Sequence, residues 1–159
     1  MPTPRPLAAD DLNWVHALNE FHAVELSSMA PAAFRLLVDG ARYARVIDRE
    51  AAFLLAFDAK PTSNSPNFDW FQARYDRFLY IDRVAVAEHA RRQGMAKAVY
   101  LDLFAYAREA GFRLIGCEVN ADPPNPGSDA FHAALGFEVA GEARLTDRDK
   151  TVRYFTCAL

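Results

Sequence analysis

A short loop ahead of a long helical pattern carries residue types that bind anions. It reads Glu88-His89-Ala90-Arg91-Arg92-Gln93-Gly94-Met95-Ala96. Backbone N–H groups at a helix start have no partner within the helix and carry partial positive charge, so they can hold a phosphate. Gly94 and Ala96 leave room for such a group, and Arg91 and Arg92 add charge. The pattern RxxGxA therefore indicates a pyrophosphate site, and the alternative is an ordinary basic helix start.

A second group of candidate residues follows the next predicted strand. It consists of Asn125, the pair Phe131-His132 and the run Leu135-Gly136-Phe137. Histidine has a reference pKa of ~6.5, so the His132 side chain can exchange a proton near neutral pH. Ser128 and His132 are one helical turn apart on a different face from Phe131 and Leu135, so we expect His132 to point away from that apolar stripe. The alternative role of His132 is structural.

Hydrophobic spacing predicts the elements that position these residues. A helix from Gly94 to Ala110, ended by Gly111, lies between apolar strands at Leu79–Val86 and Phe112–Val119. Such a strand–helix–strand unit is expected to be parallel and right-handed. The charged pair Asp82-Arg83 interrupts the first strand and needs partners if that strand is buried.

Further elements flank this unit on both sides. In chain order we expect a helix from Asp10-Asp11 to about Glu25, a helix over Ala32–Val38, a hairpin of Tyr43–Ile47 and Ala51–Phe57, a loop over Asn120–Gly127, a helix over Ser128–Leu135, and strands Phe137–Ala143 and Thr151–Ala158 around a turn at Asp147–Lys150. Residues 58–78 fit no regular element, because turn residues are followed by a cluster of aromatic ones.

Two regions are candidates for a second binding site. The aromatic cluster, which includes Trp70, Phe71 and Tyr75, could wall a pocket for a small molecule or could simply cover the sheet. His22 and Glu25 lie about one turn apart near the end of the first predicted helix, and we count both as candidates for the same site.

Composition bounds the function classes. The chain has 159 residues, 52% of them hydrophobic, and a net charge of −3. We therefore expect a single domain over residues 1–159, with no general affinity for nucleic acid or an anionic membrane. The two cysteines, Cys117 and Cys157, lack CxxC spacing, which indicates buried thiols rather than a zinc site or a disulfide. No signal-peptide pattern is present, so the expected location is the cytoplasm.

The two motif groups, in this order and on these elements, resemble the GNAT superfamily of acyl-CoA N-acyltransferases over about residues 79–140. The resemblance implies an α/β fold of the α+β type, with flanking helices and a mixed, mostly antiparallel central sheet. Its parallel strands, here 79–86 and 112–119, would splay apart to admit the pantetheine of acetyl-CoA. No metal is implied.

The resemblance also assigns the cofactor site. Backbone groups of the strand would bind the pantetheine amides and polarise the thioester carbonyl, and the loop amides would hold the pyrophosphate. The implied cofactor-binding residues are Val84, Ala85, Val86, Arg91, Arg92, Gln93, Gly94, Met95, Ala96, Asn125 and Ser128.

One departure and one open assignment concern the catalytic residues. His132 stands where many family members carry a tyrosine that protonates the leaving thiolate, and a histidine could do the same work. The general base could be Asp82, Glu118 or Tyr80, all in the two strands that border the expected cleft, and Tyr80 is also an acceptor-site candidate. The structural alternatives are an ion pair between Asp82 and an arginine and a cross-strand pair for Glu118. Proton loss through water would need no base.

Three function classes follow from the resemblance. The favoured one is an N-acetyltransferase that moves an acetyl group from acetyl-CoA to a primary amine of a small molecule or peptide by direct attack. The alternatives are a non-catalytic acyl-CoA-binding or sensing module and an interaction domain that docks through residues 62–78. His132 and the intact loop favour the enzyme. The expected partner is the amine acceptor, without nucleic acid or membrane, and a homodimer stays open. The candidates for binding this acceptor are the residues of the second site, which are His22, Glu25, Trp70, Phe71 and Tyr75.

Overall fold

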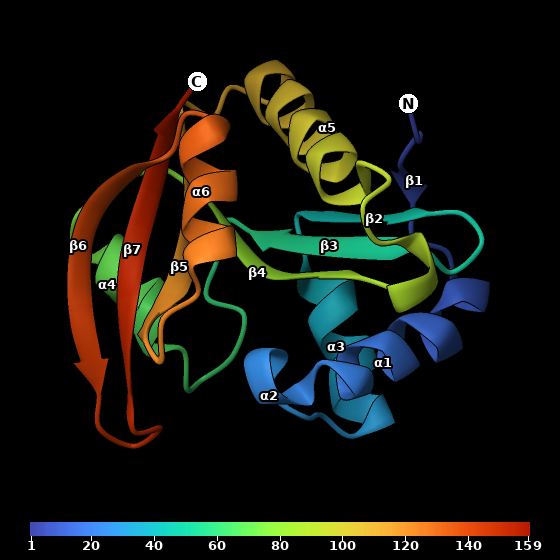
Figure 1. Cartoon of the computed structure of the whole chain (residues 1–159), viewed down its shortest axis with the longest axis horizontal. Coiled ribbons are helices and arrows are strands. Elements are labelled where there is room, and N and C mark those ends of the chain that lie inside the picture. Colours follow the sequence, from blue (N-terminus) through green and yellow to red (C-terminus); the bar gives the residue numbers. More distant parts are fainter.

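A seven-stranded sheet organises the chain in the order β1-β2-β3-β4-β5-β7-β6 (Figure 1). The computed structural model describes all residues from 1 to 159. The strands are β1 Arg5–Pro6, β2 Tyr43–Ile47, β3 Ala52–Phe57, β4 Leu79–Val86, β5 Leu114–Asp122, β6 Glu138–Leu145 and β7 Lys150–Ala158. Only β4 and β5 run parallel, and every other neighbouring pair is antiparallel. The expected mixed, mostly antiparallel sheet is thus confirmed.

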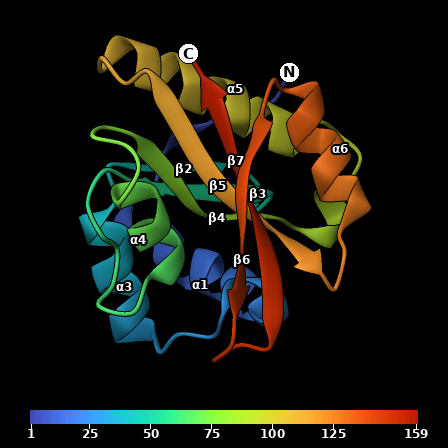
Figure 2. The same cartoon turned by 90° about the vertical axis from the view of Figure 1, so that its left-hand side faces the viewer.

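Helices cover both faces of this sheet. They are α1 Leu12–Phe21, α2 Ala23–Leu26, α3 Pro31–Gly40, α4 Pro66–Gln72, α5 Met95–Glu109 and α6 Pro126–Ala134, with short 3₁₀ turns at Ala9–Asp11 and Glu88–Ala90. Figure 1 shows α5 on one side of β3 and β4, with α1 and α3 on the other. Figure 2 shows α4 and α6 on opposite sides of β5 and β7.

Strand β3 shows how alternation divides the core between the two faces. Phe53 and Leu55 pack in the cluster with α1 and α3, whereas Leu54 and Ala56 pack in the cluster with α5. Successive side chains of a strand point to opposite faces, so a strand covered on both sides is apolar throughout. All six residues of β3 are accordingly buried.

The helix α5 follows the prediction closely. Its buried stripe includes Val99, Leu103 and Ala107, and it ends before Gly111, which has a φ of 84°. A left-handed residue after the last turn is the usual helix stop, and glycine adopts it without a Cβ penalty. The strand–helix–strand unit is confirmed as β4, α5 and β5.

Several element boundaries differ from the sequence-based expectations. The first helix stops at Phe21 and resumes as α2, because His22 leaves helical geometry with φ −101° and ψ 27°. The short strand β1 and the helix α4 had not been predicted. Strand β5 begins two residues later than predicted and continues through Asp122, into the expected loop.

Both cysteines are free and buried, as expected. Burial raises the pKa of the Cys117 thiol well above its usual value, which disfavours the reactive thiolate. No helix of this chain combines the length and the apolar character needed to cross a membrane.

Candidate active site

The site begins where β4 and β5 separate. These strands pair only at Leu79 with Ile115 and at Tyr80 with Gly116. Beyond Tyr80, β4 continues to pair with β3 and β5 with β7, so their facing edges have no strand partner. A cavity of about 570 Å³ opens between them. The splayed strand pair is therefore present.

This first cavity brings together residues from both groups of sequence motifs. Of the predicted cofactor residues it is lined by Val84, Ala85, Val86, Arg91, Asn125 and Ser128, and of the catalytic candidates by Asp82, Glu118 and His132. Both acceptor candidates of the first predicted helix, His22 and Glu25, also line it. The His22 Nε2 atom lies 3.3 Å from the Val86 carbonyl oxygen, so this histidine also ties α1 to the β4 edge.

The loop that joins β4 to α5 offers unpaired amides. No backbone carbonyl accepts a hydrogen bond from the amides of residues 92–97, and the first helical bond runs from the Ala98 N–H to the Gly94 carbonyl. Gly94 has a φ of 77°, and a Cβ placed on it would meet no atom within 4 Å. The glycine is thus required by backbone conformation and faces open space. These amides, with exposed Arg91 and Arg92, fit the diphosphate of coenzyme A.

Residues 92–96 do not line the first cavity. They are Arg92, Gln93, Gly94, Met95 and Ala96, of which the first three are exposed and the last two half-buried. Their place between β4 and α5 puts them at the end of the cleft-facing strand edge. This position suits the diphosphate end of an extended cofactor rather than its thioester end.

His132 on α6 is surrounded by aromatic side chains and does not lie on a separate polar face. Its ring stacks on Phe155 at 5.7 Å between centroids, with Tyr100, Phe131 and Phe137 also against it. The expectation that it points away from the apolar stripe was wrong, because α6 packs this side against β7 and α5. His132 is only 6% exposed, although it still lines the cavity.

Hydrogen bonds fix the protonation state of His132. Its Nδ1 atom lies 2.7 Å from the Ser128 carbonyl oxygen, which can only accept, so Nδ1 carries the proton. Its Nε2 atom lies 2.9 Å from the Tyr100 hydroxyl. Burial lowers the pKa of His132, which favours the neutral ring. Neutral His132 therefore accepts a hydrogen bond from Tyr100, so the proton at this contact belongs to the Tyr100 hydroxyl.

Glu118 lies beside the point where the strands part. The Tyr80 hydroxyl donates to its carboxylate at 2.6 Å. Burial raises the pKa of Glu118 to about 7, and the neighbouring Asp82 carboxylate adds to the rise while the Tyr80 hydrogen bond opposes it. A carboxylate with a pKa near neutrality is suited to accept a proton from an ammonium group.

Asp82 and Tyr80 have other partners. The Arg83 Nε atom donates to the Asp82 carboxylate at 3.0 Å, and the Arg83 side chain is also bound by Asn19 and the Ser27 carbonyl. Burial raises the pKa of Asp82, and Arg83 opposes the rise. Burial also raises the pKa of Tyr80 well above its usual value, which keeps it protonated as a donor. Glu118 is therefore the best-placed base of the three.

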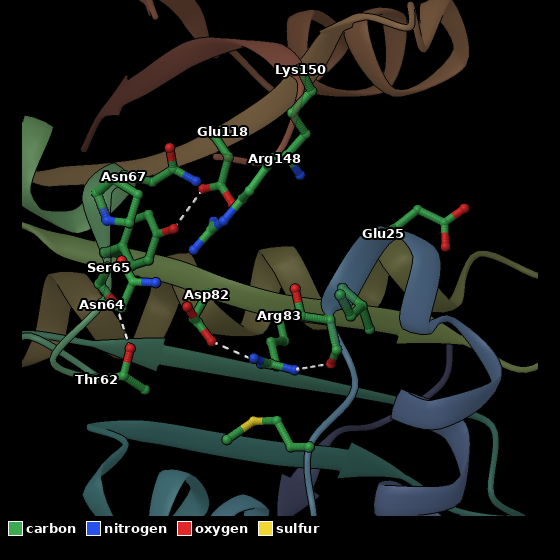
Figure 3. Close-up of a pocket in the computed structure, with 15 residues that line it drawn as sticks. Glu25, Thr62, Asn64, Ser65, Asn67, Asp82, Arg83, Glu118, Arg148 and Lys150 are labelled. Atoms are coloured by element: carbon green, nitrogen blue, oxygen red, sulfur yellow. Dashed lines mark hydrogen bonds and ion pairs between the residues drawn. The ribbon is translucent and has the colours of Figure 1, made fainter. Parts of the chain in front are cut away.

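A second, smaller cavity of about 180 Å³ adjoins the first (Figure 3). Residues that line both are Glu25, Leu26, Asp82, Glu118 and Lys150. Tyr80 lines only the second cavity, together with polar residues of the 58–67 segment and with Arg148. Glu118 and Asp82 thus stand at the junction of two spaces, one between the splayed strands and one on the side of α2 and α4.

The aromatic residues of the 62–78 segment line neither cavity. The prediction that Trp70, Phe71 and Tyr75 border the acceptor is therefore not supported by the structure. Phe71 is completely buried, and its ring occupies the space where a side chain on Gly116 would lie. Trp70 stacks on Tyr154 at 4.2 Å and fills the same kind of space above Gly141. These side chains cover the sheet, which was the alternative role considered for the aromatic cluster.

Tyr100, Arg148 and Lys150 line the cavities and had not been singled out by sequence. Tyr100 belongs to the buried face of α5 and looks like a core residue in the helical pattern. Arg148 and Lys150 fall in the predicted Asp147–Lys150 turn, where charged residues are ordinary. No group of three or more His, Cys, Asp and Glu side chains is arranged to hold a metal ion.

Comparisons with known proteins agree with this geometry. Residues 65–137 match the model of the Acetyltransferase (GNAT) family, a range that contains β4, the loop, α5, β5 and α6. No curated protein matches the sequence.

Solved structures share the fold over nearly the whole chain. The ribosomal-protein-S18-alanine N-acetyltransferase from Escherichia coli is 20% identical, with a TM-score of 0.72 over 99% of this chain and 94% of that one. Ard1 from Thermoplasma volcanium is 17% identical, with a TM-score of 0.77 over 99% and 97%. Arabidopsis thaliana NAA60 in complex with acetyl-CoA is 16% identical, with a TM-score of 0.76 over 100% and 99%.

The splayed strands, the amide-bearing loop and the family match together define an acyl-CoA-dependent N-acetyltransferase. Residues 65–137, which carry β4, the loop, α5 and β5, are similar to the GNAT acetyltransferase family, which uses acetyl-CoA as its acetyl donor.

Proposed function

We propose that this protein transfers the acetyl group of acetyl-CoA directly to a primary amine of a small molecule or peptide, with Glu118 as the general base. The observation that carries the proposal is the position of the Glu118 carboxylate at the junction of the two cavities, with its pKa raised to about 7. An ammonium group must lose a proton before its nitrogen can attack a carbonyl carbon. Glu118 can take that proton where the acceptor and donor spaces meet.

The free edge of β4 and the loop would hold the donor. Val84, Ala85 and Val86 line the first cavity, and the amides of residues 92–97 face no acceptor of the protein. An unpaired strand edge binds an extended chain that carries amides, and helix-start amides bind phosphate. The bound donor supplies an acetyl group on a thioester, and a β4 amide would polarise its carbonyl.

We assign protonation of the departing thiolate to Tyr100, held by His132. Neutral His132 has no proton on Nε2, which accepts from the Tyr100 hydroxyl. In the proposed step, the Tyr100 hydroxyl turns and gives its proton to the sulfur. The second proton that the attacking nitrogen loses then restores the tyrosine, so the protons balance. His132 acts as a positioning residue in this scheme.

Acetyl-CoA-dependent release of thiol across a panel of amines tests the proposal, with mass spectrometry to identify the acetylated product. We expect equal amounts of free coenzyme A and acetylated amine. Binding of acetyl-CoA without turnover of any amine would overturn the proposal in favour of a sensing module.

A further inference from the structure

The second cavity has cationic side chains whose hydrogen-bonding capacity is unused. The Lys150 side chain forms no ion pair or hydrogen bond with another residue, and the one ion pair of the Arg148 side chain is with Asp147, at 3.8 Å. Arg83, in the same lining, is held in place by hydrogen bonds from its Nε and Nη1 atoms to Asp82, Asn19 and Ser27. Arg148 and Lys150 differ from Arg83 because no hydrogen bond holds their side chains, so their N–H donors are available for a ligand.

These cations share the cavity with the carboxylates without pairing to them. In Figure 3 the Arg148 side chain reaches toward the space between Glu118 and Asp82, and the Lys150 side chain points into the same space. Neither forms an ion pair with Glu118 or Asp82. Their charges still act there, since Arg148 lowers the pKa of Asp82 and Lys150 that of Glu118, against the larger effect of burial.

We propose that the acceptor is a small primary amine that also carries an anionic oxygen group, bound by Arg148 and Lys150. This inference rests on the proposed function, because it describes the acceptor of that reaction. A ligand with both charges satisfies the site, since its amine faces Glu118 and its oxyanion receives the N–H donors of the two cations.

The rest of the lining supports a small polar acceptor. The cavity measures about 180 Å³, and Thr62, Asn64 and Asn67 border it from the segment before and at the start of α4. The large aromatic residues of that segment are turned into the sheet cover instead. A bulky apolar amine would find neither the space nor the apolar surface that its burial requires.

The test compares matched acceptors on the full chain. A series of amines with a terminal carboxylate is assayed beside the phosphonates and the uncharged carboxamides of the same chain length, and a tripeptide amide is included. The quantity compared is the ratio of kcat/KM for an anionic acceptor to kcat/KM for its carboxamide, and we expect this ratio to be well above one in the wild type. Arg148→Gln and Lys150→Met should each lower this ratio by about 10- to 100-fold, as for loss of a charge-assisted hydrogen bond. The carboxylate and phosphonate arms distinguish the two sources of the anionic group.

A control variant and separate readouts keep the outcomes distinct. Arg35→Gln removes an exposed arginine on α3 that lines neither cavity, and it should keep the wild-type ratio. A ratio near one in the wild type, an unchanged ratio in both variants, or better turnover of the tripeptide amide would overturn this inference while leaving acetyl transfer intact. No turnover of any amine, with acetyl-CoA bound in calorimetry, would instead overturn the proposed function.

Discussion

The Tyr80 hydroxyl donates a hydrogen bond of 2.6 Å to the Glu118 carboxylate across the point where β4 and β5 part. Tyr80 lies in the last parallel pair of these strands, opposite Gly116, and Glu118 follows two residues later. The separation of the strands thus leaves the Glu118 carboxylate beside both cavities, while Tyr80, its hydrogen-bond donor, still lies in the paired part of the sheet. This hydrogen bond opposes the rise in the Glu118 pKa that burial causes.

Replacing Tyr80→Phe removes this donor and should raise the pKa of Glu118 further, because the charged carboxylate loses its hydrogen bond. The base is deprotonated above its pKa, so the lower limb of the pH profile of kcat/KM should shift to higher pH. Steady-state rates in a series of buffers measure the shift. A shift to lower pH would contradict the arrangement.

The loop before α5 yields a binding prediction. Gly94→Trp should weaken acetyl-CoA binding at least about tenfold, because the new side chain enters the space beside the free amides and the φ of 77° penalises a Cβ by ~1–2 kcal/mol. Calorimetric titration measures the affinity. Gly40→Trp is the control, since that glycine also has open space around it. Equal affinity of Gly94→Trp and wild type would show that the donor binds elsewhere.

The hydroxyl of Tyr100 is expected to matter for turnover rather than for donor affinity. General acid catalysis is typically worth ~10²–10⁴-fold, so Tyr100→Phe should lower kcat by a factor in or somewhat below that range. Tyr106→Phe removes a hydroxyl from the same helix, where it accepts from Arg42, and should turn over normally. His132→Ala should also lower kcat, since Tyr100 loses its partner. Wild-type turnover in folded Tyr100→Phe would assign the proton to water.

The aromatic cover of α4 yields a stability prediction. Phe71→Ala should lower the free energy of unfolding by about 3–5 kcal/mol, because a fully buried ring is lost above Gly116. Since Phe71 lines neither cavity, the KM for the amine should change little under conditions where the variant is folded. Urea unfolding and rate measurements on the same preparation separate these effects. A large rise in KM in the folded variant would return the aromatic cluster to the acceptor site.

Local sequence patterns were sufficient to predict the strand–helix–strand unit that carries the donor site. Gly94 and Gly111 mark the two ends of α5 because their backbone conformations favour glycine, and the apolar stripe between them has helical spacing. The acceptor side depends on contacts between distant segments. The direction of Trp70 and Phe71 is set by the two glycines on β5 and β6 beneath them, and no spacing within residues 62–78 encodes those partners.

The chemistry of the candidate site was also only partly readable. Glu118 and Asp82 were recognised as candidates, but their ranking depends on Tyr80 and Arg83, which are neighbours in space whose bonds no motif specifies. Tyr100 is indistinguishable from core residues in a helical stripe until α6 brings His132 to it. The break at His22, which bonds to the β4 edge, is likewise a tertiary contact.

The pH dependence of kcat/KM in wild type and Glu118→Gln tests the central claim most directly. Glutamine keeps the size of the side chain and an oxygen for Tyr80 but cannot take a proton. For the wild type we expect a limb that rises with pH around a midpoint of about 7 and reflects Glu118 deprotonation, in addition to the limb of the acceptor amine. In Glu118→Gln the first limb should disappear, with kcat lowered ~10²–10⁴-fold and the affinity for acetyl-CoA unchanged. The control is Glu138→Gln, at an exposed position on β6, which should match the wild type. Retention of that limb and of the wild-type rate in Glu118→Gln would contradict the assignment of Glu118 as the base.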